Sequence, residues 1–74
     1  MALTRDHGNP VNARTVELGE HGMRVVCARP LRVDEILRFH LAPGLSADHS
    51  DGQARVLREH ARNEYVLRVE RWDG

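Results

Sequence analysis

The sequence has no lysine, one cysteine and three aromatic residues among its 74 positions. A single cysteine excludes a disulfide framework within the chain and a zinc site built from several thiolates. No apolar run approaches the roughly 18 residues that a membrane-spanning helix needs, and the first residues lack the apolar core of a signal peptide. We therefore expect a cytoplasmic domain that does not bind a membrane.

Positive and negative charges balance. The 11 arginines match 11 acidic residues, so the formal net charge is zero with neutral histidines. Proteins that bind nucleic-acid polymers usually carry a basic surplus, so the balance predicts no such partner. A chain of this length forms one domain with a small core, which leaves little room for a deep catalytic cleft. No nucleophile–base arrangement or glycine-rich phosphate loop is visible either, and we expect no enzymatic activity.

Metal binding is also not expected. The histidines do not recur at the short spacing of metal ligands, and no second cysteine is present. They are His7, His21, His40, His49 and His60. Cys27 alternates with Val25 and Met23, a pattern typical of a small core residue rather than a nucleophile.

Apolar and polar residues alternate along short segments that Gly, Pro or Asn separate, which predicts antiparallel strands. The predicted strands cover residues 12–18, 23–28, 35–41, 53–59 and 64–71. Strands of this length with tight turns predict an all-β fold, a small antiparallel β-barrel of about five strands. Residues 1–11 are predicted to form a flexible N-terminal arm, and residues 12–74 the barrel domain.

Two features of this pattern bear on structure and partners. A helix over residues 51–62 is the alternative to the fourth strand, because Ala54 and Leu57 recur at helical spacing, but the turn signal at Asn63 favours a strand. Val26, Ile36 and Val66 fall on outward positions of their strands. An apolar stripe on so small a barrel predicts a protein partner or a homo-oligomer.

The order of these segments resembles a known family. Residues 15–25, which include Glu17 and the turn that ends at Gly22, resemble the signature region of the PilZ domain, a strand, an Asp/Asn-x-Ser-x-x-Gly turn and a second strand. Residues 30–44 are similar to the family's next strand and its Leu-Pro-Gly ending, and the segments 52–58 and 65–70 to its closing hairpin. The resemblance covers about residues 12 to 72. It implies a PilZ-like β-barrel, and many members bind the bacterial second messenger cyclic di-GMP.

The resemblance also implies where a ligand would lie. In the family, an Arg-x-x-x-Arg arm contacts phosphate and guanine, and the turn contacts the guanine edges; forked guanidinium donors suit both tasks. The residues nearest those positions are Arg5, Arg14, Glu17, Gly19 and Gly22. Glu17 replaces Asp or Asn, Gly19 replaces Ser, and no Arg-x-x-x-Arg precedes the turn.

These departures shape the predicted function. The resemblance predicts a regulatory binding module of cyclic di-GMP signalling whose own nucleotide binding is weak or lost, with no other cofactor. The alternative is a ligand-independent barrel that binds another protein or associates with itself.

Overall fold

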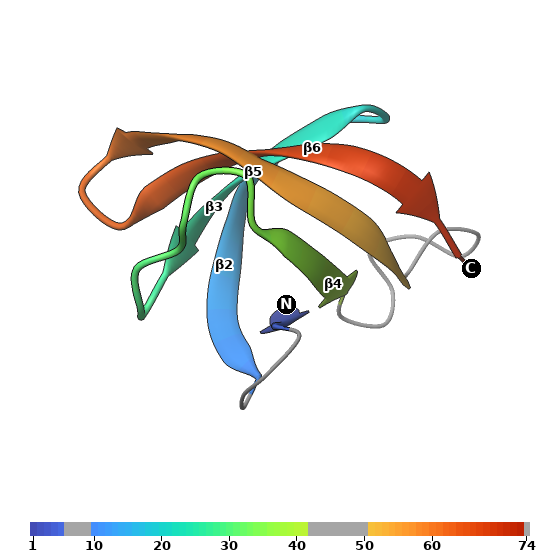
Figure 1. Cartoon of the computed structure of the whole chain (residues 1–74), viewed down its shortest axis with the longest axis horizontal. Helices are drawn as coiled ribbons and strands as arrows, with labels where there is room; N and C mark the ends of the chain where they lie inside the picture. The colour runs from blue at the N-terminus through green and yellow to red at the C-terminus, as the bar shows by residue number, and fades with distance from the viewer. Residues whose placement is uncertain (6–9, 42–50, 74) are drawn as a thin grey trace.

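The computed structural model describes residues 1–5, 10–41 and 51–73, and within these ranges it contains strands and no helix (Figure 1). The strands are β1 (Ala2–Thr4), β2 (Val11–Leu18), β3 (Gly22–Cys27), β4 (Ile36–His40), β5 (Asp51–Ala61) and β6 (Glu64–Trp72). All neighbours are antiparallel, and they close a barrel in the order β1-β2-β3-β6-β5-β4. The predicted all-β antiparallel barrel is confirmed; it has six strands, and the sequence predicts about five.

The additional strand is β1. Leu3 is completely buried and pairs with Val11 of β2 on one side and with Phe39 of β4 on the other. β1 therefore joins the two ends of the sheet and closes the barrel. Within the segment that the sequence predicts as a flexible arm, residues 1–11, residues 2–4 thus form a strand and Val11 begins β2. A strand of three residues is too short to show an alternating pattern in the sequence.

The five predicted strands are all present, with ends displaced by at most two residues. The helical alternative over residues 51–62 is wrong, since β5 covers Asp51–Ala61 and buries every second residue over its first half. The turn between β5 and β6 contains Asn63 at φ 63°, a backbone conformation that asparagine tolerates better than most residues.

A single core fills the barrel. Alternation places one face of each strand inside, and no polar or charged side chain is buried among the described residues. Cys27 belongs to this core, as its alternation with Val25 predicts, and burial raises the pKa of its thiol. The buried side chains are Leu3, Val11, Met23, Val25, Cys27, Leu31, Leu37, Phe39, Leu41, Ala54, Val56, Tyr65 and Leu67.

β2 departs from the expected alternation. Val16 and Leu18 are the apolar residues of its second half, yet they are 44% and 41% exposed. Val16 continues the outward positions of Asn12 and Arg14. The register of β2 against β3 shifts between Thr15 and Glu17, so Val16 is the extra residue of a β-bulge, and the residues after it change face. Leu18 keeps the register of the buried Met23, but it lies at the end of the strand.

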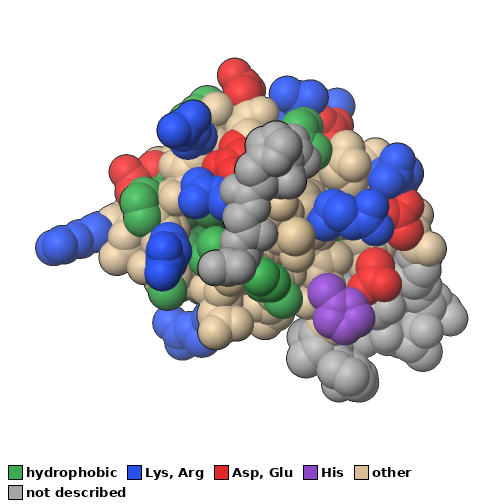
Figure 2. Space-filling model, turned by 60° about the horizontal axis from the view of Figure 1, so that its bottom comes forward, with side chains coloured by type: hydrophobic (Ala, Val, Ile, Leu, Met, Phe, Trp, Pro, Cys, Tyr) green, Lys and Arg blue, Asp and Glu red, His purple; other side chains and the backbone are tan. Residues whose placement is uncertain are grey.

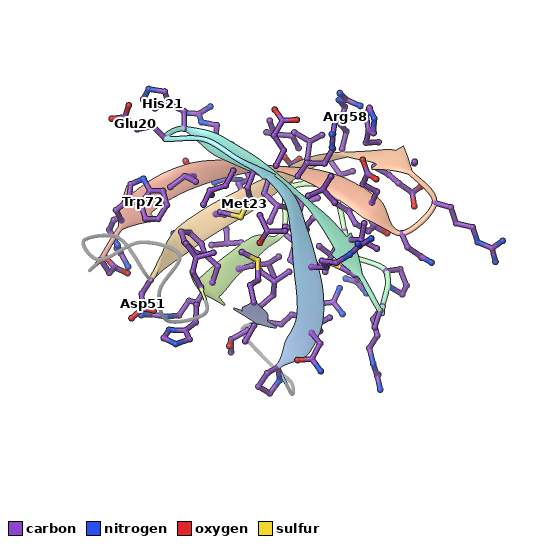
Figure 3. The ribbon with its side chains drawn as sticks, turned by 180° about the vertical axis from the view of Figure 1, so that it is seen from behind. Glu20, His21, Met23, Asp51, Arg58 and Trp72 are labelled. Carbon is purple, nitrogen blue, oxygen red and sulfur yellow. The ribbon has the colours of Figure 1, made fainter. Side chains whose placement is uncertain are left out.

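Gly52 leaves room for two aromatic side chains to meet at one end of the barrel. It pairs with Phe39 of β4 and with Trp72 of β6, and the two rings contact each other edge to face with centroids 5.2 Å apart. A Cβ at this position would lie 2.3 Å from the Arg71 carbonyl oxygen and 2.5 Å from the Phe39 ring. The indole Nε1 of Trp72 donates to the Glu20 carbonyl oxygen at 3.0 Å, which ties this end to the β2–β3 turn (Figure 3).

We therefore expect Gly52→Ala to destabilise the barrel by about 1–3 kcal/mol, the usual effect of an added methyl group in a filled core. Urea unfolding followed by tryptophan fluorescence measures this change. Gly19→Ala is the matched control, because a Cβ there would lie at an ordinary 3.6 Å from the Gly22 carbonyl oxygen. Equal midpoints for the two variants would contradict the packing argument.

Candidate functional site

The structure divides the five predicted ligand residues between two ends of the barrel. Four of them lie on the β2–β3 hairpin: Glu17, Gly19 and Gly22 lie at its turn or beside it, whereas Arg14 pairs with Val26, near the other end of β3. Arg5 follows β1 and contacts the segment between β3 and β4. That segment follows Cys27, at the far end of β3 from Gly22, about 17 Å away at 3.3 Å per residue. The five residues therefore do not form one site.

Arg5 is already engaged by a carboxylate. Its Nε and Nη2 donate to the two carboxylate oxygens of Glu35 at 2.6 and 2.9 Å, and Nη2 also donates to the Pro30 carbonyl oxygen at 2.9 Å. The Arg32 amide donates to Glu35 at 3.0 Å. The hydrogen bond from Arg5 holds the pKa of Glu35 below its usual range, and Glu35 raises that of Arg5. This forked pair fixes the β3–β4 segment to the end of β1 and leaves Arg5 few donors for a ligand.

Glu17 has a charged partner as well. Arg24 of β3, the residue opposite it, lies 3.2 Å from the Glu17 carboxylate and 3.0 Å from that of Glu64 on β6. Glu17 is the outer member of this trio, with a side chain that remains 71% exposed. It keeps an acceptor free for a further partner outside the barrel.

The two glycines of the hairpin have structural roles. The Gly19 amide donates to the Gly22 carbonyl oxygen at 2.8 Å, which closes the turn over Glu20 and His21. A Cβ on Gly22 would lie 3.0 Å from the Leu67 carbonyl oxygen, so its small size permits close approach of β3 to β6.

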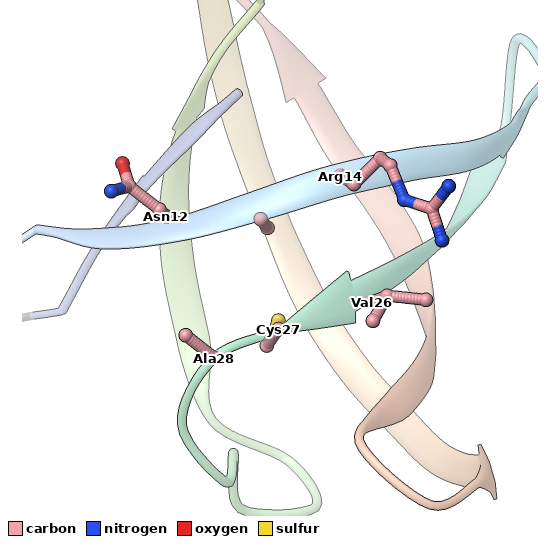
Figure 4. A pocket seen from close by; sticks show the side chains of 6 residues that line it. Asn12, Arg14, Val26, Cys27 and Ala28 are labelled. Atoms are coloured by element: carbon pink, nitrogen blue, oxygen red, sulfur yellow. The ribbon is translucent and has the colours of Figure 1, made fainter.

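A shallow, open and mainly apolar pocket lies over the β2–β3 ladder (Figure 4). Of the five predicted ligand residues, only Arg14 lines it. The lining residues are Asn12, Ala13, Arg14, Val26, Cys27 and Ala28. A depression of this kind, with one charged side chain at its margin, offers little of the enclosed surface that small-molecule sites provide.

The most distinctive feature of the hairpin is the backbone edge of β2 that faces away from β3, whose second half has no backbone partner among the described residues. The Ala13 amide donates to the Met1 carbonyl oxygen at 3.0 Å, and the Met1 amine donates to that of Ala13 at 2.9 Å. Backbone groups alternate sides along an antiparallel strand, so those of Thr15 point the same way as those of Ala13, away from β3. The Gly19 amide faces β3, and the groups of Leu18 therefore also point away from it.

This edge begins where the pairing with β1 ends. β1 is aligned with Val11 and Asn12 only, and Met1 bonds Ala13. Among the described residues, none pairs with the backbone of Thr15 or Leu18 on this side. Sequence reasoning did not reveal the edge, because it results from the difference in length between β1 and β2.

The outward apolar residues do not form the stripe that the sequence predicts. Val26 pairs with Arg14 and Glu64. Val66 lies between Arg24 and Arg58, and Ile36 pairs with Arg55. Each of the three is half-buried and pairs directly with charged residues. Val26 and Val66 are diagonal neighbours on β3 and β6, but Ile36 lies on β4, which pairs with neither strand. Figure 2 shows the same mixture on one face, with small apolar groups between charged side chains.

Within the described residues, no three His, Cys, Asp or Glu side chains come together as a metal site, and no helix is long and apolar enough to cross a membrane. His40 contacts Asp51, and His60 lies 3.7 Å from Glu64. His7 and His49 lie outside the described residues.

Comparison of the chain with protein-family models, with curated proteins and with solved structures found no match.

The Arg5–Glu35 pair predicts a pH dependence of stability. A carboxyl whose pKa is lowered in the folded state stabilises it above the unfolded pKa, about 4.3 for glutamate, and this stabilisation is lost as the pH falls through the folded pKa. Glu35→Gln should therefore unfold more easily than wild type at pH 7, with a difference that shrinks below about pH 4. Urea midpoints at several pH values measure it. Glu59→Gln, which removes an exposed carboxylate, is the control; an equal pH profile in both variants would contradict the role of the pair.

Proposed function

We propose that this chain is a small regulatory β-barrel that binds an extended protein segment along the unpaired edge of β2, as a PilZ-like module with weak or lost nucleotide binding. The observation that carries the proposal is the pair of outward-facing backbone positions at Thr15 and Leu18, beside the exposed side chains of Val16 and Leu18. An open strand edge offers main-chain hydrogen bonds to any extended partner, and adjacent apolar side chains select among partners.

The arrangement of charges supports a protein partner over a nucleotide. A cyclic dinucleotide requires several guanidinium groups converging on its phosphates. Here Arg5 is bound to Glu35 at one end of the barrel, and Arg14 lies on the outer face of β2. Glu17 shares Arg24 with Glu64, so the hairpin offers no concentrated positive charge.

Direct titration tests the nucleotide part of the proposal. We expect no heat of binding when cyclic di-GMP is titrated into the folded protein at moderate salt. The contrary result would be micromolar or tighter binding that Arg5→Ala and Arg14→Ala together abolish, and it would restore the nucleotide site.

Blocking the edge tests the protein-binding part. The proline in Thr15→Pro removes an amide that makes no bond to β3, so the barrel should still fold, as circular dichroism would show. Eight-residue peptides selected from a library for binding to wild type should bind this variant at least about tenfold more weakly, since a main-chain hydrogen bond and its geometry are lost.

Thr15→Ala is the matched control, because it keeps the amide and should bind the same peptides as wild type does. Selected peptides that bind Thr15→Pro as tightly as wild type would place their contact elsewhere and overturn the proposal, as would a selection that yields no binding peptide.

A further inference from the structure

We infer that the segment bound by the β2 edge is the same edge of a second copy of this chain, paired antiparallel about a two-fold axis. This inference rests on the proposed function and names its partner. Edge-to-edge pairing of identical strands is a self-complementary arrangement, which a two-fold axis requires.

The open backbone positions define the register. Thr15 and Leu18 are the two residues of β2 whose backbone groups face outward without a described partner. Placing Thr15 opposite Leu18 of the second copy brings these groups together, and the two-fold axis repeats the same pair in reverse. Each pair exchanges an N–H···O bond in both directions, as in a regular antiparallel ladder. The β-bulge between the two residues causes no mismatch, because both copies contain it at the same position.

The charges on the outer face fit this register. Arg14 would lie opposite Gly19 of the second copy, and hence diagonal to Glu17 of that copy. Diagonal neighbours on paired strands are about 7–8 Å apart at Cα, a distance that an arginine side chain spans. Arg14 is exposed and has no ion-pair partner among the described residues, and Glu17 keeps most of its side chain exposed. The two-fold axis forms this pair twice.

The same register places Val16 beside the axis, opposite Glu17 of the second copy and diagonal to its own counterpart. Its side chain is the most exposed apolar group of β2. Thr15 and Leu18 of the second copy, which lie opposite each other, are both uncharged and therefore do not repel each other. The backbone amide and carbonyl of Ala13 already bond Met1, so the pairing between the two copies ends before Ala13. So short an interface predicts a reversible dimer that depends on concentration.

Exchange of the two charges tests the register. Arg14→Glu places two acidic residues on each edge and Glu17→Arg places two basic ones, so each variant alone should dimerise about tenfold more weakly than wild type. An equimolar mixture of the two variants restores both Arg–Glu pairs and should dimerise like wild type. Sedimentation equilibrium over a range of concentrations measures all of these masses, and circular dichroism verifies the fold of each variant.

A matched charge change elsewhere controls for net charge. Arg58→Glu and Glu59→Arg alter exposed residues of β5 and should leave the dimer unchanged, alone or mixed. A dimer whose strength does not respond to Arg14→Glu, or a mixture no stronger than its components, would overturn the register. A wild-type chain that stays monomeric at millimolar concentration would overturn the inference as a whole.

Covalent trapping provides an independent readout. Val16→Cys should form an intermolecular disulfide on mild oxidation, whereas wild type should not, because Cys27 is buried. Thr15→Pro in the same background should prevent the crosslink. If no dimer forms but selected peptides still bind wild type and fail on Thr15→Pro, the inference fails and the proposed function stands. If dimer and peptide binding are both absent, both fail.

Discussion

The closure of the barrel by β1 is the constraint on which the remaining structure depends. Three residues join β2 to β4, and the fully buried Leu3 anchors them in the core. A sheet of this size would otherwise have two open edges and an incompletely covered core, which is costly for a chain with so little apolar surface to bury. Because β1 is short, it pairs with only the first half of β2, and within the described residues nothing pairs with the outer edge of the second half. The short β1 thus completes the core and also leaves the strand edge that we propose as a binding surface.

Two local devices hold the ends of the barrel. At one end, the fork between Arg5 and Glu35 attaches the β3–β4 segment to the residue that follows β1. At the other, Gly52 makes room for the contact between Phe39 and Trp72, whose indole also reaches the β2–β3 turn. Both join segments that are distant in sequence. They explain why residues that look available for function, Arg5 above all, are committed to the fold.

The alternating pattern was sufficient for most of the fold. It located five strands, their tight turns and the inward faces of β3, β4 and β6, because side chains on a half-buried strand must alternate. It failed at β1, where three residues carry no recognisable period, and at Val16, where a bulge adds a residue to one strand. Ligand residues inferred from resemblance fared differently. Their order along the chain placed four on one hairpin, but the distance of Arg5 from the turn of that hairpin is a property of the closed barrel.

The sequence by itself determined the class of the molecule: a small all-β domain with balanced charge, a core of alternating aliphatic residues and a buried cysteine. These features follow from composition and local period, which each segment carries alone. Only the tertiary structure decided which arginines were committed to ion pairs, which apolar residues were paired with charged ones and where, among the described residues, a strand edge had no partner. Those outcomes depend on register and on the relative lengths of strands that are far apart in the chain, and no single segment encodes them.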